Sequence, residues 1–426
     1  MSLKNFFSKS DKTKQPQAIE AENITVDILK TLIPIRSLSI EKIESFATDR
    51  KAERYPAKTI LFNQGDQADC AFYLLSGKVS ISDNAGKNYE VEANTAKAKF
   101  PLSSGIKYTL TAEAKTDVSI LRVSQKIMSM QASEPHHPLS LNFPPHLSNS
   151  RLIQTFSQNY MEEDIPVPSM PDVALKLRKA MEKDIGVAEA VKIIQFDPVI
   201  AAKLIQVANC PLYVTANPAK TCLEAISRIG LKATQNLVIS LCIKDIFQAK
   251  NSAIKKLLES IWRQSVYVSC ISYVLAAETK IVNPEEALLA GLICDIGLVP
   301  FLTYAANLPD NYYTEQELIA AIPYIRGPVG MNILREWDFP EELVAMPSFA
   351  EDWYQHTQDK LSLIDIVVLS RLHSKIGTAD MAQLPAITSI PAASKLDHIQ
   401  LSPENSLHIL HNAQNKINEA KRAFSI

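Results

Sequence analysis

The sequence predicts a multidomain α+β protein, with an N-terminal β-barrel flanked by helices and a larger all-α domain towards the C-terminus. Three observations support this prediction. The chain has 426 residues, which is too long for one ordinary core. Residues 54–123 contain short runs of β-branched and aromatic residues separated by turn residues, which is typical of strands. From Val173 to about residue 350, apolar residues recur at helical spacing instead.

The composition argues against several classes of function. The net charge of −2 and the pI near 6.5 give the chain no basic field, so we expect no nucleic-acid partner. The six cysteines show no Cys-x-x-Cys spacing, which favours buried free thiols in a reducing compartment over zinc or redox sites. The N-terminus lacks a secretory signal, and no apolar run is long enough for a membrane span. We therefore expect a soluble, cytoplasmic protein with no membrane partner.

The N-terminal part begins with a predicted disordered tail at 1–23, where Lys, Ser and Gln are frequent. The first domain is expected at 24–128. It opens with a short helix around Ile24–Leu32 and a second helix for which Ser39 is a suitable N-cap. Many short strands follow, which is typical of a small barrel or sandwich. The strands are expected at 54–62, 71–75, 78–82, 89–91, 108–112 and 118–123.

A flexible linker is expected at 129–160, because this stretch is rich in Ser, Pro, His and Asn. His136 and His137 within it are a conceivable metal-binding pair, but we favour a pair of solvated linker residues. The second domain is expected at 161–358, and a helical extension at 359–426 is expected to pack on it.

The second domain carries clear helix signals. In one segment, Asp197 can accept hydrogen bonds from the first free amides, and Pro198 suits the first helical position. Apolar residues then fall on a single face of this helix, at Ile200, Leu204, Val207 and Ala208. Short loops between helices predict packed antiparallel neighbours. Further helices are expected at 222–229, 232–247, 253–277, 284–304, 315–321, 329–336, 340–345, 361–375 and 403–423.

The second domain also shares several short motifs with one known family. They are Pro168–Pro171, Asp197-Pro198, Leu212-Tyr213, Glu224–Ile226, Ile229–Leu231, Ile261–Ser265, Gly291–Gly297 and Trp337–Pro340. Taken together, these motifs resemble the HDOD domain, a catalytically degenerate branch of the HD superfamily that is found in bacterial signalling proteins. The resemblance implies an all-α, HD-like fold and a role in regulating a signalling pathway.

The resemblance also implies that the metal centre of an HD hydrolase is lost. Such a centre binds divalent cations through imidazole and carboxylate groups and activates water against a phosphoester. By alignment to the family pattern, Gln264, Cys294 and Arg326 stand where histidines are expected, and only Asp295 is kept. None of the eight histidines lies between residues 147 and 355. We therefore predict no metal, no catalytic residue and no cofactor.

Two interpretations of Asp295 remain open at the level of sequence. In the first, Asp295 pairs with Arg326, whose positive charge would stand where the metal charge would be. In the second, Asp295 caps a helix turn within Cys294–Gly297. Both interpretations are compatible with the loss of catalysis.

The first domain contains turn and hairpin motifs at Ile60–Asp66, Phe72–Ser80 and Thr111–Val118. These motifs are similar to the scaffold of a cyclic nucleotide-binding domain, and the resemblance covers residues 26–128. In that family a Phe-Gly-Glu element orients the ribose hydroxyl, and a downstream Arg pairs with the cyclic phosphate through its planar fork. The scaffold motifs themselves say little about a ligand.

The expected ligand-binding stretch departs from the family pattern. Leu102 replaces the Glu of the element, and Pro101 removes an amide donor. Tyr108 falls near the Arg position, and Lys107 can supply one point charge, so these two are the weak candidates for ligand contacts. Losing a bidentate charged contact typically costs a few kcal/mol. We therefore favour a vestigial barrel used for docking or dimerisation over orthodox cyclic AMP or cyclic GMP binding.

The sequence as a whole predicts a non-enzymatic bacterial signal-transduction adaptor or regulator. The degenerate HD fold would be a docking scaffold for an unidentified protein partner of a signalling pathway, and the N-terminal module would modulate it. A second copy of the chain is a further candidate partner. One alternative is a sensor that binds a cyclic mono- or dinucleotide in the barrel. Another, less favoured, is a metal-dependent phosphohydrolase with rebuilt ligands.

Overall fold

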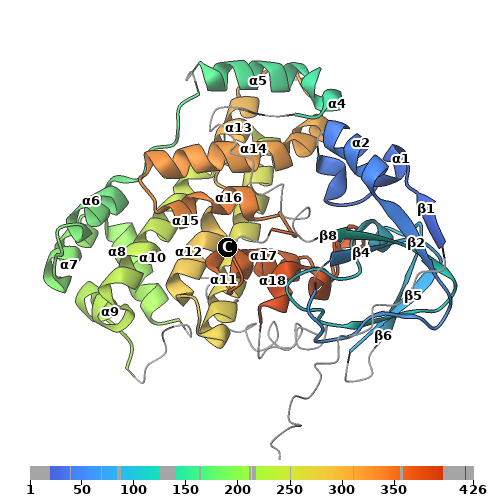
Figure 1. The fold of residues 1–426 in the computed structure, drawn as a ribbon. Helices are drawn as coiled ribbons and strands as arrows, with labels where there is room; N and C mark the ends of the chain where they lie inside the picture. Colours follow the sequence, from blue (N-terminus) through green and yellow to red (C-terminus); the bar gives the residue numbers. More distant parts are fainter. Residues whose placement is uncertain are drawn as a thin grey trace, which may run out of the picture. The chain divides into compact units, whose positions relative to one another are not determined.

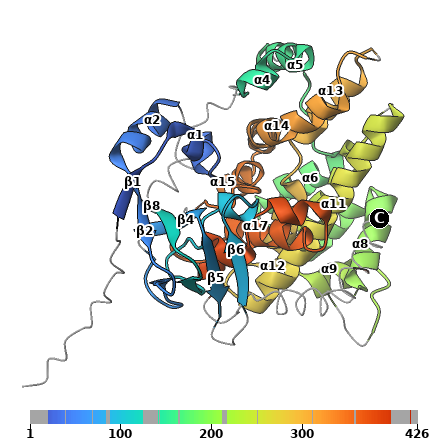
Figure 2. The same cartoon turned by 90° about the vertical axis from the view of Figure 1, so that its right-hand side faces the viewer.

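The computed structural model describes residues 20–396 apart from 39, 69, 84–87, 125–140, 142, 163–164, 211–212, 214–216, 250, 310 and 356–357, and it also describes residue 418. The chain divides into two compact units, which are seen in Figures 1 and 2. The first, which we call the sheet unit, combines residues from 1–131 with Ala382–Ile390. The second, which we call the helical unit, combines residues from 132–381 and 391–426. The candidate histidine pair His136-His137 lies outside the described residues.

The sheet unit contains two four-stranded antiparallel sheets. One sheet has the strand order β1-β2-β8-β4, and the other has the order β3-β7-β5-β6. Among the described residues no strand pairing joins the two sheets, so the predicted closure into a barrel is not confirmed. The strands are β1 (Glu20–Asn23), β2 (Lys51–Tyr55), β3 (Ile60–Phe62), β4 (Cys70–Ser76), β5 (Lys78–Ser82), β6 (Asn88–Glu92), β7 (Thr111–Ala114) and β8 (Val118–Ser124).

A single hydrophobic core receives side chains from both sheets. Phe72 and Ile120 reach it from the first sheet, and Val79 and Ile81 reach it from the second. The chain passes from β4 in one sheet to β5 in the other at Gly77, which has a φ of 85°. The hairpin predicted at Phe72–Ser80 is therefore wrong, because β4 pairs with β8 whereas β5 pairs with β6 and β7. A Cβ on Gly77 would collide with the backbone carbonyl of Asp117, so both the conformation and the close approach require glycine.

Short helices complete the sheet unit. They are α1 (Val26–Leu29), η1 (Ile35–Ser37), α2 (Ile40–Asp49), η2 (Lys97–Lys99) and η7 (Ile387–Ser389). The predicted first helix is therefore confirmed in shortened form, with the Thr25 hydroxyl accepting from the amide of Ile28. The prediction of a disordered tail at 1–23 is wrong for its last four residues, because Glu20–Asn23 pairs with β2 as strand β1. Ser39 lies outside the described residues.

The helical unit is built from α-helices of very different lengths. Of these, α11, α12 and α17 pack against one another, as Figure 1 shows. The helices are α4 (Pro145–Ser148), α5 (Arg151–Met161), α6 (Asp172–Met181), α7 (Val187–Gln195), α8 (Pro198–Ala208), α9 (Cys222–Ile229), α10 (Leu231–Ile243), α11 (Ser252–Thr279), α12 (Pro284–Ile293), α13 (Leu298–Ala306), α14 (Glu315–Glu336), α15 (Glu341–Val344), α16 (Met346–Phe349), α17 (Leu363–Ser374) and α18 (Pro391–Ser394).

The start of α8 confirms the helix signals predicted for it. The Asp197 carboxylate accepts hydrogen bonds from the amides of Val199 at 3.0 Å and Ile200 at 3.1 Å, and Pro198 is the first helical residue. All four residues of the predicted apolar face are buried.

The linker predicted at 129–160 is wrong in its second half, where α4 and α5 form. Helix α5 buries Phe156 and Tyr160 on one face, and Phe156 packs edge-on against Phe301 of α13 at 4.9 Å between ring centroids. Apolar residues at helical spacing thus outweigh the Ser- and Asn-rich composition of this stretch. The packed face makes α5 part of the helical unit, next to α13 in Figures 1 and 2.

Other predicted boundaries also change. The helix expected at 284–304 is interrupted at Cys294–Gly297, and the two expected at 315–321 and 329–336 are one helix, α14. The helical extension at 359–426 packs on the helical unit through α17, but its residues Ala382–Ile390 belong to the sheet unit. The helix expected at 403–423 lies outside the described residues except for Asn418.

One stretch of the described chain is long and apolar enough to pass a composition test for a membrane span. It covers Pro284–Ala306, and 89% of its window is buried inside the structure. Helices α12 and α13 are packed in the core of the helical unit, and this burial is enough to explain their apolar composition.

We predict that α5 contributes to stability as a packed helix. Phe156→Ala removes a fully buried ring and is expected to lower the free energy of unfolding by about 3–5 kcal/mol. Gln158→Ala, on the exposed face of the same helix, is expected to change it by less than about 0.5 kcal/mol. Urea denaturation of both variants measures the difference. Equal, small effects would contradict the packing of α5 and restore the linker interpretation.

Candidate functional site

Three of the four predicted HD positions, Cys294, Asp295 and Arg326, meet at the turn between α12 and α13. This turn contains Cys294 and Asp295, both of which are buried. It lies very close to α14, because a Cβ on Gly297 would collide with the backbone of Arg326 and Gly330. Glycine at this position therefore allows the turn to approach α14 and brings Asp295 to the side chain of Arg326.

Four charged residues form a closed set of ion pairs at this turn. We call Asp295, Arg326, Glu351 and Arg371 the charge ring. Asp295 Oδ1 lies 2.7 Å from Arg326 Nε, and Asp295 Oδ2 lies 2.8 Å from Arg371 Nη1. Glu351 closes the ring, with its two carboxylate oxygens each 2.6 Å from a nitrogen of the two arginines. Each guanidinium thus bridges both carboxylates, and the four formal charges cancel.

The charge ring is held by elements that are distant in sequence. Arg326 lies on α14, Arg371 lies on α17, and Glu351 follows α16. Asp295, Arg326 and Arg371 are 3%, 7% and 5% exposed. Burying charges is costly, and leaving one without its partner typically costs about 3–5 kcal/mol. The positions of α14 and α17 relative to the α12–α13 turn are therefore coupled to the ring.

The two arginines determine the ionisation of the ring. Burial would raise the pKa of Asp295, but the charges of Arg371 and Arg326 hold it below its usual range. Burial would also raise the pKa of Glu351, but the charges of Arg326 and Arg371 hold it well below its usual value. Burial would lower the pKa of Arg371, but Asp295, Cys294 and Glu351 raise it well above its usual value. The ring is therefore fully ionised at neutral pH.

Cys294 and Gln264 take no part in the ion pairs of the ring. Burial, with a contribution from Asp295, raises the pKa of the Cys294 thiol to about 12, so this cysteine stays protonated. Its Sγ donates to the carbonyl of Gly291 at 3.0 Å. Gln264 lies on α11 and donates through Nε2 to the Ser374 hydroxyl at 2.6 Å. Neither residue presents a metal ligand in this arrangement.

The sheet unit contains the second candidate site, the loop at 100–109 that precedes β7. We call residues 100–109 the cassette loop. Tyr108 points into the core, where its ring stacks on Phe62 at 4.3 Å and its hydroxyl donates to the carbonyl of Cys70 at 2.8 Å. Lys107 is exposed. The two candidate ligand contacts therefore do not converge on one point of the loop.

Comparison with known proteins agrees with both resemblances. A model of the HDOD domain matches residues 167–353, and a model of the cyclic nucleotide-binding domain matches residues 52–132. The chain carries an HDOD domain and a cyclic nucleotide-binding domain. The first lies within the helical unit, and the second makes up most of the sheet unit.

Three relatives are similar to parts of this chain. An uncharacterised protein of Treponema pallidum (strain Nichols) is 21% identical over 236 residues, which are 51% of this chain and 44% of that protein, so the match spans less than half of the relative. A crystal structure of a provisionally named metal-dependent phosphohydrolase from Shewanella amazonensis SB2B superposes with a TM-score of 0.56 and 23% identity, covering 66% of this chain and 99% of that one. An HDOD domain protein of unknown function from Geobacter sulfurreducens gives a TM-score of 0.48 and 19% identity, covering 65% and 98%.

The residues of the HDOD domain do not fit a catalytic divalent cation. Imidazole and carboxylate ligands are needed, but the carboxylate of Asp295 already contacts two guanidinium groups that would repel a cation. Among the described residues, no group of three or more His, Cys, Asp or Glu side chains has a geometry that could hold a metal ion. The positive charge at this position therefore belongs to arginines.

Sequence reasoning found half of the charge ring. Of the two interpretations of Asp295 left open by the sequence, the structure shows the pairing with Arg326, at 2.7 Å, although the Arg326 Nε–H does not point along the hydrogen-bond direction. Arg371 and Glu351 were missed, because neither belongs to a family motif. A usable signal was present, since Arg371 is the only charged residue besides Asp365 in the apolar segment Leu363–Leu372. A charge within a buried helix requires a partner.

We predict that the stability contributed by Asp295 depends on pH. The folded-state pKa of Asp295 is depressed, so its contribution is fully present above the unfolded value of 3.8 and is lost as pH falls below it. Asp295→Asn is therefore expected to lower the free energy of unfolding by about 3–5 kcal/mol near pH 7 and by progressively less towards about pH 3. Urea denaturation across this range measures the change.

Asp338→Asn is the matched control, because Asp338 forms a surface ion pair with Arg178 and its side chain is 82% exposed. Asp338→Asn is expected to change the free energy of unfolding by less than about 1 kcal/mol across the whole pH range. A constant cost of Asp295→Asn at all pH values would contradict the account of the charge ring.

Proposed function

We propose that this protein is a non-enzymatic adaptor in bacterial signal transduction, and that its HDOD domain is a rigid scaffold for docking a protein partner. The two domains are those of a signalling-associated protein. The charge ring supports the non-enzymatic role, because arginines stand where an HD hydrolase would need a metal ion and its ligands. We place this role in the cytoplasm, where its six buried free thiols would stay reduced.

The physical argument is that a guanidinium balances charge without supplying the chemistry of a metal. A bound cation lowers the pKa of a coordinated water and polarises the phosphoryl group. A guanidinium has only donors in a fixed plane and stays protonated, so it cannot activate water in this way. In the charge ring both guanidinium groups are also engaged by Asp295 and Glu351, which leaves them poorly placed to bind a phosphoester.

A fully ionised ring with three buried members and a half-buried Glu351 would hold a scaffold rigid. If α14, α17 or the α12–α13 turn moves alone, the member that it carries loses both of its ion-pair partners and two other members lose one each. Because an unpaired buried charge is costly, these elements are held in one arrangement. A protein partner would therefore meet a preorganised surface and lose little affinity to ordering. A second copy of the chain is one such partner.

A cyclic nucleotide sensor is the second candidate, and the match of residues 52–132 to the cyclic nucleotide-binding domain favours it. The cassette loop weakens this candidate. Its residues Leu102, Ser104 and Thr109 offer an aliphatic side chain and two hydroxyl groups, and the loop contains no arginine. A cyclic phosphate would therefore be bound without the bidentate charged contact that the family uses.

We predict that the purified protein hydrolyses no phosphodiester. Bis(p-nitrophenyl) phosphate and cyclic di-GMP, each with added Mn²⁺, are expected to turn over no faster with wild type than with the Asp295→Asn variant. Asp338→Asn, which changes an exposed residue, is the matched control for differences in purification and assay between the variants. Hydrolysis that co-elutes with the wild-type protein and is lost in Asp295→Asn alone would contradict the proposal, because it would assign a catalytic role to the kept aspartate.

A further inference from the structure

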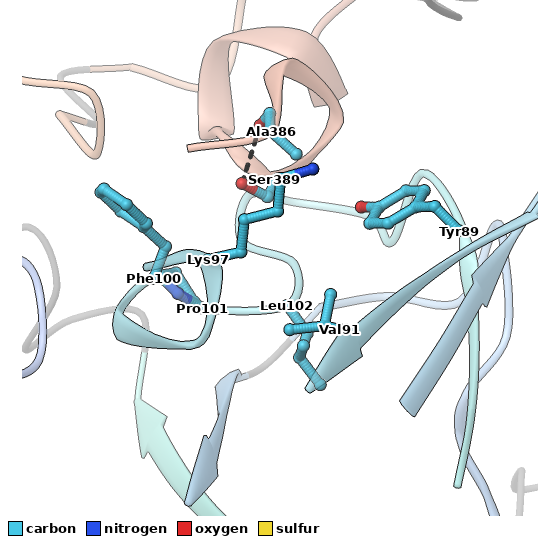
Figure 3. Close-up of a pocket in the computed structure, with 8 residues that line it drawn as sticks. All are labelled: Tyr89, Val91, Lys97, Phe100, Pro101, Leu102, Ala386 and Ser389. Atoms are coloured by element: carbon cyan, nitrogen blue, oxygen red, sulfur yellow. Dashed lines mark hydrogen bonds between the residues drawn. The ribbon is translucent and has the colours of Figure 1, made fainter. Parts of the chain in front are cut away.

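The cassette loop of the cyclic nucleotide-binding domain is covered by another part of the chain. Phe100, Leu102 and Ser104 are all buried. The covering residues are those of Ala382–Ile390, which belong to the sheet unit although they lie far along the sequence. Figure 3 shows Ala386 and Ser389 of this segment on the opposite side of a small cavity from residues of the cassette loop.

Two hydroxyl groups of the cassette loop bind backbone carbonyls of the segment. Thr109 Oγ1 donates to the carbonyl of Thr388 at 2.6 Å, and Ser104 Oγ donates to the carbonyl of Ser389. The segment forms a short helical turn here, η7, in which the Ser389 amide and hydroxyl both reach the carbonyl of Ala386 at 2.8 Å. The hydroxyl groups of the loop are thus used to hold a peptide backbone.

Little space remains between the segment and the loop. The partly open cavity that they line with β6 and Lys97 measures about 10 Å³, which is room for about one water molecule. Pockets that hold small-molecule ligands measure about 300–1,000 Å³. A cyclic nucleotide therefore cannot occupy this place while the segment does.

The chemistry of the two sides matches. The segment Ala382–Ile390 reads Ala-Gln-Leu-Pro-Ala-Ile-Thr-Ser-Ile and contains no charged residue. Its residues Pro385 and Ile390 are buried. Lys97 is the charged residue at the cavity, and its ammonium group lies over the Tyr89 ring, 5.5 Å from the centroid. Hydroxyl and apolar groups suit a neutral peptide better than they suit a phosphate.

The geometry points to a peptide-binding site in place of a nucleotide-binding site: the cassette loop holds the uncharged segment Ala382–Ile390 of the same chain as its ligand. The ligand class is a short neutral peptide that offers two consecutive backbone carbonyls, from Thr388 and Ser389, followed by a buried aliphatic side chain, that of Ile390. Both flanks of the segment belong to the helical unit, so the site retains part of the chain beyond the HDOD domain. This inference does not depend on whether the HDOD domain is catalytic.

Hydrogen exchange of the full-length protein tests the site directly. Thr109→Val removes the donor to Thr388 and is expected to speed exchange of amides in 383–390 about fivefold, the factor for a net hydrogen bond of about 1 kcal/mol. The double variant Ser104→Ala/Thr109→Val is expected to speed it further. Thr59→Val is the matched control, because Thr59 also donates to a backbone carbonyl, that of Pro56 at 2.7 Å, away from the segment. It should leave exchange in 383–390 unchanged.

Binding of a peptide added in solution is an independent test of the site. Pro385→Asp/Ile390→Asp places two charges at buried positions and should release the segment. A fluorescent peptide of residues 382–390 is expected to bind this variant but not wild type, where the tethered segment has a high effective concentration. Adding Thr109→Val should weaken peptide binding about fivefold. The same peptide with Ile390→Asp should not bind.

Two results would overturn the inference. One is exchange in 383–390 that is equal in wild type and in Ser104→Ala/Thr109→Val. The other is a released variant that binds cyclic AMP but not the peptide, which would make the loop a nucleotide site that the segment only covers. If amides of β8 lose protection in the released variant, that variant is misfolded and the exchange of the two milder variants decides.

Discussion

The contact between the Asp295 carboxylate and two guanidinium groups is the constraint on which the helical unit depends. A carboxylate that is 3% exposed needs positive charge beside it, whether this comes from a metal ion or from a side chain. Arg326 and Arg371 supply it at 2.7 and 2.8 Å. Two arginines would leave an excess positive charge, and Glu351 cancels it. Charge balance with two arginines and a glutamate is thus a sufficient structural role for the aspartate of the HD motif.

The cyclic nucleotide-binding domain shows a parallel replacement. Tyr108, near the position where the family carries a phosphate-binding arginine, is turned into the core and stacks on Phe62. The remaining polar groups of the cassette loop, Ser104 and Thr109, contact backbone carbonyls of the chain itself. In both domains a site built for a charged ligand keeps its scaffold, while its charges or hydroxyl groups are engaged by the protein. This is the physical basis for the proposed adaptor role.

Much of this could be predicted from local sequence, and the exceptions have a common cause. The cap at Asp197 and the strand-rich first domain follow from capping, periodicity and turn residues that lie close together in the chain. The pairing of Asp295 with Arg326 followed from the family pattern. Arg371 and Glu351 could not be placed, because the ring joins segments that only tertiary packing brings together.

The same cause explains the remaining differences from the predicted fold. Composition suggested a linker at 129–160, yet an apolar face on α5 packs on α13. Barrel closure depends on which distant strands pair, and the described strands form two separate sheets. Nothing in the residues of Ala382–Ile390 indicates that they belong with the sheet unit. Local signals therefore predicted elements well and long-range partners poorly.

The melting temperature with and without Mn²⁺ tests the central claim most directly. A cation that binds only the folded state raises the melting temperature by mass action, and the stabilisation grows with the logarithm of the cation concentration once this exceeds the dissociation constant. If arginines have replaced the metal, millimolar Mn²⁺ is expected to leave the melting temperature of wild type unchanged. A rise in wild type that grows with the Mn²⁺ concentration and disappears in Asp295→Asn would contradict the account, because it would show that Asp295 still holds a metal ion.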